Sequence, residues 1–192
     1  MTSTAKKGFT LVELLIVIAI LGVLATATVV VLNPAEMLAQ ARDSNRVSDL
    51  ASLNTALGVY VSSVASPDLD AANAVTCASG IAPFNGYSYA AVTTASFATT
   101  AASVVAVRTV AGAGWLPVAF SDISGGSPIS TLPIDPTGTG DLIYRYNCDN
   151  TAKTYELNAA FESVKYLTTL DLDGKDGGDQ TTFYEVGTSL TL

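Results

Sequence analysis

The dominant pattern in the chain is an uninterrupted apolar block from Phe9 to Leu32, in which Glu13 is the single ionisable side chain. At about 1.5 Å per residue, a helix of this length spans roughly 36 Å, which exceeds the ~30 Å hydrocarbon core of a bilayer. Because Lys6 and Lys7 precede the block, the N-terminus is expected to stay cytoplasmic and the remainder to be exported. The pattern predicts a transmembrane and assembly helix over residues 9–32.

Three other interpretations of this block fit its residues less well. A soluble core helix would carry a polar face, which is missing. A cleaved signal peptide has a shorter apolar region followed by a small-x-small site, which Ala25-Thr26-Ala27 imitates. A plain signal anchor accounts for the length but leaves Glu13 unexplained. A carboxylate inside a membrane costs on the order of 3 kcal/mol and usually has a partner.

Cleavage between Gly8 and Phe9 would explain the position of Glu13. The cut would create an amino terminus four residues before Glu13, and this amine is the only fixed cation that cutting supplies. Pairing of the amine with the carboxylate, most usefully on a neighbouring subunit, would set the register of helices packed in a filament. We therefore assign cleavage and modification to Gly8 and Phe9, and assembly to Glu13.

The run Lys6-Lys7-Gly8-Phe9-Thr10-Leu11-Val12-Glu13-Leu14-Leu15 resembles the prepilin motif of type IV pilins and of type II secretion pseudopilins. Basic residues, a glycine at the cut, a phenylalanine after it and a glutamate five residues into the product all match that motif. The resemblance implies that a membrane-embedded prepilin peptidase removes residues 1–8 as a leader peptide and methylates the new amine of Phe9. It also implies that Glu13 is needed for ordered subunit addition.

The same resemblance implies a function and a set of partners. The chain would be a structural subunit of a type IV pilus-like or type II secretion pseudopilus filament, with no catalysis of its own. Its partners would be copies of itself, other pilin-like subunits, the peptidase, and an inner-membrane assembly platform with its ATPase. It would be a single-pass protein of the cell membrane and then part of an extracytoplasmic filament. The alternative is a membrane-anchored surface adhesin or binding module that does not polymerise.

A second helical pattern follows the apolar block. Asn33-Pro34 interrupts the chain because proline lacks a backbone donor, so the helix should kink or restart there with Asn33 as a cap. Residues 33–65 are then predicted to form an amphipathic helix that packs on a sheet. Charged side chains lie mostly on its other faces, where Asp43 and Arg46 would form one minor ion pair. The apolar stripe consists of Leu50, Leu53, Leu57, Val61 and Val64.

Residues 66–192 are predicted to form a globular β-rich head that ends in an acidic loop. Trp115 is expected in its core, and the Ala/Thr run at residues 90–102 favours neither helix nor strand. Strands are expected at residues 104–110, 115–120, 143–148 and 154–161, the last two as a hairpin. The prediction is an α+β fold: a long N-terminal helix, with a protruding apolar half and an amphipathic half on a small antiparallel sheet. The family resemblance implies the same type IV pilin-like shape.

Composition and charge narrow the chemistry of the chain. Its 192 residues include 9 Lys and Arg against 17 Asp and Glu, a net charge of -8, whereas nucleic-acid binders usually present a basic face. The chain contains no histidine, which excludes the Ser-His-Asp and Cys-His arrangements and His-ligated zinc sites. We therefore expect no enzyme activity and no specific binding of nucleic acid.

The chain contains two cysteines, Cys77 and Cys148. In an exported chain, an even pair predicts one disulfide, while two buried free thiols are the alternative. A bridge that closes so long a loop would stabilise the fold by roughly 4 kcal/mol.

The acidic loop near the C-terminus carries four carboxylates within nine residues, together with three glycines. Calcium prefers such hard oxygen ligands and tolerates irregular geometry, although the spacing departs from an EF-hand. A solvated acidic loop is the alternative. Similar C-terminal loops bind calcium in major pseudopilins, which this chain also resembles in its Pro133-x-Asp135 and Tyr144-x-Tyr146 pattern. The candidate calcium ligands are Asp171, Asp173, Asp176 and Asp179, with Glu185 as a distant addition.

Overall fold

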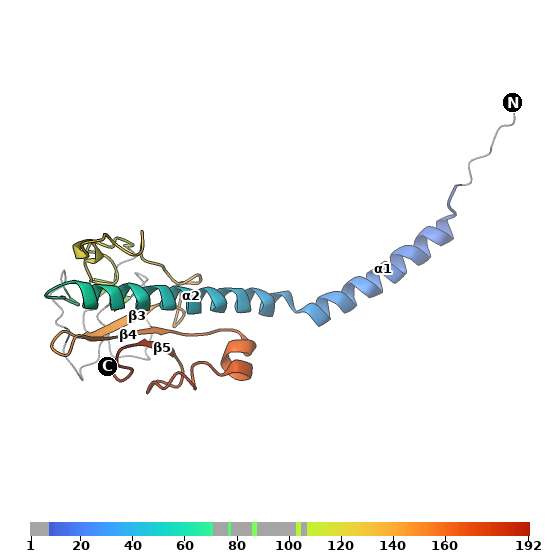
Figure 1. Ribbon diagram of the computed structural model, residues 1–192. Helices are drawn as coiled ribbons and strands as arrows, with labels where there is room; N and C mark the ends of the chain where they lie inside the picture. The colour runs from blue at the N-terminus through green and yellow to red at the C-terminus, as the bar shows by residue number, and fades with distance from the viewer. Residues whose placement is uncertain (1–7, 71–76, 78–85, 88–102, 105–106) are drawn as a thin grey trace, which may run out of the picture. The chain divides into compact units, whose positions relative to one another are not determined.

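The computed structural model of the chain describes residues 8–70, 77, 86–87, 103–104 and 107–192 (Figure 1). The chain divides into two compact units, Met1–Leu38 and Ala39–Leu192. The Ala/Thr run at residues 90–102 lies outside the described residues.

Two consecutive helices meet at Asn33. Helix α1 spans Leu11–Leu32 and helix α2 spans Pro34–Ser63. Asn33 itself is left-handed, with φ 39° and ψ 71°, and its N–H donates to the carbonyl of Val29 at 3.2 Å. Its side-chain oxygen accepts the N–H of Glu36 at 3.4 Å, so one residue closes α1 and caps α2. The predicted restart at Asn33-Pro34 is confirmed.

The second unit contains a sheet with the strand order β2-β1-β3-β4-β5. Its strands are β1 Gly86–Tyr87, β2 Ser103–Val104, β3 Arg145–Asp149, β4 Thr154–Ala159 and β5 Tyr184–Gly187. Strands β3, β4 and β5 pair antiparallel, which confirms the predicted α+β class with a small antiparallel sheet. The short β2 pairs parallel with β1, which the sequence did not predict.

Strands β3 and β4 form the hairpin that the sequence predicted, in register from Arg145 opposite Asn158 to Asp149 opposite Thr154. The Asp149 side chain stabilises the turn, because its Oδ1 accepts the backbone N–H groups of Thr151 at 2.7 Å and of Ala152 at 3.0 Å. Strand β5 was not predicted. Its four residues are too few to show a clear alternation, and it depends on β4 for its pairing.

The strand predicted at residues 115–120 is wrong. This segment contains an isolated bridge and runs into the 3-10 helix η1, Phe120–Asp122. Pro117 supplies no N–H for a ladder, and the backbone N–H of Trp115 instead donates to the carbonyl of Val107 at 3.0 Å. The segment is nevertheless buried, and Trp115 lies in the core as predicted, with its indole N–H donating to the carbonyl of Pro133 at 2.8 Å.

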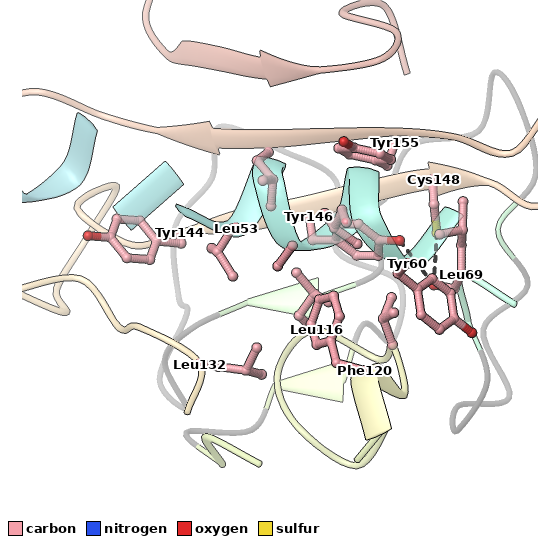
Figure 2. Packing of buried hydrophobic residues seen from close by; sticks show 14 of the residues in the cluster. Leu53, Tyr60, Leu69, Leu116, Phe120, Leu132, Tyr144, Tyr146, Cys148 and Tyr155 are labelled. Atoms are coloured by element: carbon pink, nitrogen blue, oxygen red, sulfur yellow. Dashed lines mark hydrogen bonds between the residues drawn. The ribbon is translucent and has the colours of Figure 1, made fainter. Parts of the chain in front are cut away.

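The hydrophobic core lies between α2 and one face of the sheet. The predicted stripe of α2 is confirmed, since its three leucines are fully buried and Val61 and Val64 pack against the same cluster. Figure 2 shows Leu53 and Tyr60 of α2 close to Tyr146 and Tyr155 of the strands. The hydroxyl of Tyr146 donates to the carbonyl of Leu69 at 3.1 Å, so a buried polar atom is satisfied inside this cluster.

Candidate functional site

The residues assigned to processing and assembly lie together at the start of α1. Gly8 and Phe9 precede the helix in non-helical backbone, and the Phe9 side chain is 92% exposed. Among the described residues, no atom beyond its chain neighbours lies within 4 Å of the place where a Cβ on Gly8 would stand. The Gly8–Phe9 peptide bond therefore lies in exposed, non-helical backbone.

Glu13 is held at the N-terminal end of α1 by Thr10. Its Oε2 accepts the backbone N–H of Thr10 at 2.8 Å and the hydroxyl of Thr10 at 2.7 Å. In return, the Thr10 oxygen accepts the backbone N–H of Glu13 at 3.2 Å, which completes a capping box. The carboxylate is thereby directed back toward Phe9 instead of along the apolar surface of the helix.

The surface of α1 is apolar and fully exposed within its unit. Every residue of the helix is exposed, and it is part of the one helical stretch among the described residues that is long and apolar enough to cross a membrane. The hydroxyls of Thr26 and Thr28 donate to the carbonyls of Val23 and Ala25, each at 2.8 Å. These bonds satisfy the two hydroxyl groups of α1, which are its only polar side chains after Glu13. The surface of α1 therefore suits a lipid or a neighbouring apolar helix.

A buried ion network joins α2 to two loops of the head, and sequence analysis missed it. Arg46 is fully buried and makes two parallel bonds to Asp135, Nε to Oδ2 at 2.7 Å and Nη2 to Oδ1 at 2.9 Å. Its Nη1 also donates to Asp43 at 2.6 Å and to Glu162 at 2.8 Å. The expected ion pair between Asp43 and Arg46 is present. It is fully buried, however, and does not lie on a face away from the core, because Asp135 and Glu162 come from distant parts of the sequence and enclose it.

The partners of Arg46 are themselves fixed by further bonds. Asp43 accepts the hydroxyl and the backbone N–H of Ser163 at 2.6 and 2.8 Å. Glu162 takes two bonds from Arg42, both at 2.7 Å, and these hydrogen bonds hold the pKa of Glu162 at about 2. Since each charge has several partners, the network can persist in a buried place.

The two cysteines form the predicted disulfide. Cys77 is bonded to Cys148 across 71 positions of sequence, with a Cα–Cα distance of 5.0 Å. Cys148 lies in β3, as expected. The backbone N–H of Cys77 donates to Asp70 at 2.9 Å, and its carbonyl accepts the N–H of Asn150 at 3.3 Å. The bridge therefore ties the segment after α2 to the β3–β4 turn.

The acidic loop follows the π-helix η2, Lys165–Leu170, and its aspartates have different roles. Asp171 pairs with Lys175 at 3.2 Å, and Asp179 is exposed. Asp176 accepts the backbone N–H groups of Gly178 at 3.0 Å and of Glu185 at 2.7 Å, so both of its oxygens hold the backbone.

Asp173 is the member of this loop that fits a cation best. It is buried, its Oδ1 has no hydrogen-bond donor, and burial together with Asp171 and Asp176 raises its pKa. Over the part of the chain that the structure describes, no three carboxylate, histidine or cysteine side chains are arranged to hold a metal ion. Among the four aspartates, only Asp173 thus has a buried oxygen without a hydrogen-bond donor, and the four carboxylates do not converge on one point.

The outer face of the sheet is polar and nevertheless buried, which the sequence did not predict. Alternation in β4 places Glu156 and Asn158 opposite the core-facing Tyr155 and Leu157, a position that usually faces solvent. Instead the polar side chains of this face are at most 7% exposed. They are Arg145, Asn147, Asp149, Glu156, Asn158 and Glu185.

Comparison with known proteins gives one match, at the N-terminus. Residues 3–29 match the family described as the prokaryotic N-terminal methylation motif. The matched range includes Gly8, Phe9 and Glu13. No curated protein and no solved structure matches the chain.

Proposed function

From an N-terminus that carries the prokaryotic methylation motif, the hallmark of type IV pilins and pseudopilins, we propose that this chain is a structural subunit of a pilus-like or pseudopilus filament. The prepilin peptidase would cut after Gly8 and methylate Phe9. The mature subunit would then polymerise through α1. The observation that carries this proposal is the motif itself, placed on a helix whose only charge is Glu13.

Before assembly, α1 would anchor the subunit in the cell membrane with its N-terminus on the cytoplasmic side. Its 22 residues span about 33 Å, close to the ~30 Å of a bilayer core. Lys6 and Lys7 before the helix favour this orientation. The second unit, with its disulfide and its buried core, would then fold on the exported side.

Glu13 would guide subunit addition by charge. Inside hydrocarbon its carboxylate costs on the order of 3 kcal/mol unless it is paired. The capping box with Thr10 already directs the carboxylate toward the residue that becomes the new amino terminus. A neighbouring subunit's amine would pair with this carboxylate, and the pair would fix the axial register between helices.

A Glu13→Gln variant tests this proposal. Glutamine keeps the size of the side chain and can still accept the bonds of Thr10, so insertion and cleavage should continue. Incorporation into sheared filaments should fall at least about tenfold, because the pair with the amine is lost. A Thr28→Val variant, which removes a hydroxyl from the same helix without changing charge, is the matched control. Equal incorporation of Glu13→Gln and wild type would argue for a tethered adhesin that does not polymerise.

We also propose that the acidic loop binds calcium through Asp173. The support is its buried carboxylate, whose Oδ1 has no donor, in a loop with three more aspartates. The loop would then hold the segment between η2 and β5 in place. In the wild type, the midpoint of thermal unfolding should rise with calcium and fall back with chelator. In Asp173→Asn, calcium should no longer raise this midpoint. An unchanged midpoint with calcium would count against the site.

A further inference from the structure

A short apolar turn is exposed on the head, apart from the sites described above. Of the large apolar side chains that the structure describes in the second unit, five are exposed: Val59, Val107, Val164, Leu167 and Leu170. The last three lie at every third position along η2 and the residue before it, with exposures of 61%, 37% and 40%. They are called the η2 patch below. Exposed apolar side chains that gather in this way usually mark an interaction surface.

The turn is attached to the head at two points. Tyr166 of η2 packs on Phe161, with ring centroids 5.2 Å apart, and Phe161 in turn stacks on Tyr184 at 5.3 Å. Ser163, which directly precedes the patch, donates its hydroxyl and its backbone N–H to Asp43 of α2 at 2.6 and 2.8 Å. These contacts use the side of the turn that faces the head, and the patch remains on the outer side.

The contact with Asp43 holds the patch near the point where the chain would leave a membrane. Asp43 follows Leu32, the last residue of α1, by eleven positions, which correspond to about 16 Å of helix. Figure 1 shows η2, in orange, beside the first part of α2 in the head. The headgroup layer outside the hydrocarbon core is itself about 5–8 Å thick. With α1 in the membrane, a lean of the head at Asn33, where α1 ends, would bring the patch to the lipid surface.

Lysines flank the patch at both ends. Lys165 lies next to the ring of Tyr166, with its Nζ 5.5 Å from the ring centroid. Lys175 donates to the backbone carbonyl of Leu170 at 3.3 Å, and it also pairs with Asp171 at 3.2 Å, which compensates the charge of the nearest aspartate of the acidic loop. Apolar side chains bordered by lysine and tyrosine are typical of the boundary between a membrane and water.

We propose that the η2 patch docks on the phospholipid surface at the exported face of the bilayer before the subunit assembles. Its three apolar side chains would enter the boundary between headgroups and acyl chains, as those of interfacial helices do. The flanking lysines would pair with lipid phosphates, and Tyr166 suits this depth. Docking would restrict the head to one orientation on the membrane. The inference rests on the proposed membrane anchoring by α1 and does not depend on filament assembly.

The test adds a tryptophan to the patch of the full-length chain in phosphatidylcholine vesicles, with and without bromine on the acyl chains to quench nearby tryptophan. Trp115 is buried in the core and supplies a constant background. An interfacial side chain lies about 5–10 Å into the headgroup and acyl boundary, so the emission added by Leu167→Trp should fall about twofold or more. The matched control is Val59→Trp, an exposed apolar position about 24 Å further along α2 than Asp43, which should not respond.

Two further variants separate the possible outcomes. Val17→Trp on α1 should be quenched and verifies insertion, and Leu170→Trp is the second probe of the patch if Leu167→Trp does not fold. Equal responses of the patch and Val59→Trp, with Val17→Trp quenched, would overturn the inference while leaving the proposed anchor and filament intact. A patch tryptophan that lipid does not quench, but that sheared filaments shield from aqueous iodide, would assign the patch to a second copy instead. An unquenched Val17→Trp would overturn the anchor and this inference together.

Discussion

Replacing Arg46 by methionine removes the centre of the buried ion network while retaining much of the side-chain volume. The change leaves two fully buried carboxylates, Asp43 and Asp135, without the guanidinium that binds both. Asp43 retains its bonds from Ser163, and Asp135 retains the backbone N–H of Thr137 at 2.8 Å. These neutral donors compensate only part of the lost charge.

The expected loss in free energy of unfolding follows from burial. Removing one partner of a buried ion pair costs about 3–5 kcal/mol, because the remaining charge stays buried and unpaired. In a chain of this size, each kcal/mol shifts the unfolding midpoint by about 2–4 °C, so the midpoint should fall by roughly 6–20 °C. A typical domain has only about 5–15 kcal/mol of stability, so this loss is a substantial fraction of the total.

Urea unfolding followed by the fluorescence of Trp115 measures this loss, since the chain contains one tryptophan and it is buried in the head. The control is Arg42→Met, because the Arg42 side chain is 35% exposed and bonds to Glu162 at the edge of the same network. An exposed pair of this kind contributes about 1 kcal/mol or less. Equal, small losses in the two variants would refute the claim that the buried network stabilises the head.

Two further predictions concern pH and redox state. Because the pKa of Glu162 is depressed from 4.5 to about 2 in the folded chain, its contribution to stability is full above its unfolded pKa and is lost as the pH falls through this range. The free energy of unfolding, measured against pH, should therefore decline less steeply over this acidic range in Glu162→Gln, and an unchanged slope would contradict the assignment. Replacing Cys77 and Cys148 together by serine should lower the stability by roughly 4 kcal/mol, given the 71-residue separation, and a reductant should do the same to the wild type but not to the variant.

The helices and the central hairpin could be predicted because their signals are local. The apolar block, the Asn33-Pro34 interruption and the leucine stripe of α2 each lie within a few turns of helix. The alternation of Tyr155 and Leu157, which predicts strand β4, likewise involves only a few consecutive residues. In each of these cases the residues that determine the structure are neighbours in the sequence.

The features that could not be predicted depend on distant partners. The residues near Arg46 in the sequence do not indicate that Asp135 will enclose it. The sequence pattern therefore predicts an ordinary solvent-facing arginine at this position. Glu156 and Asn158 alternate as solvent-facing residues do, yet both are buried, and the backbone N–H of Leu192 donates to Glu156. The segment at residues 115–120 has the apolar content of a strand, but Pro117 and its contacts with other loops give it another conformation.

The central claim is tested most directly by the mass of the mature protein, purified from its native membrane or filament. Processing at the Gly8–Phe9 bond predicts an intact mass, and an N-terminal peptide, that begin at Phe9 and carry one added methyl group on its amine. A chain that retains Met1, or one that begins beyond Ala27, would contradict the proposal that α1 is exposed by cleavage and polymerises through Glu13.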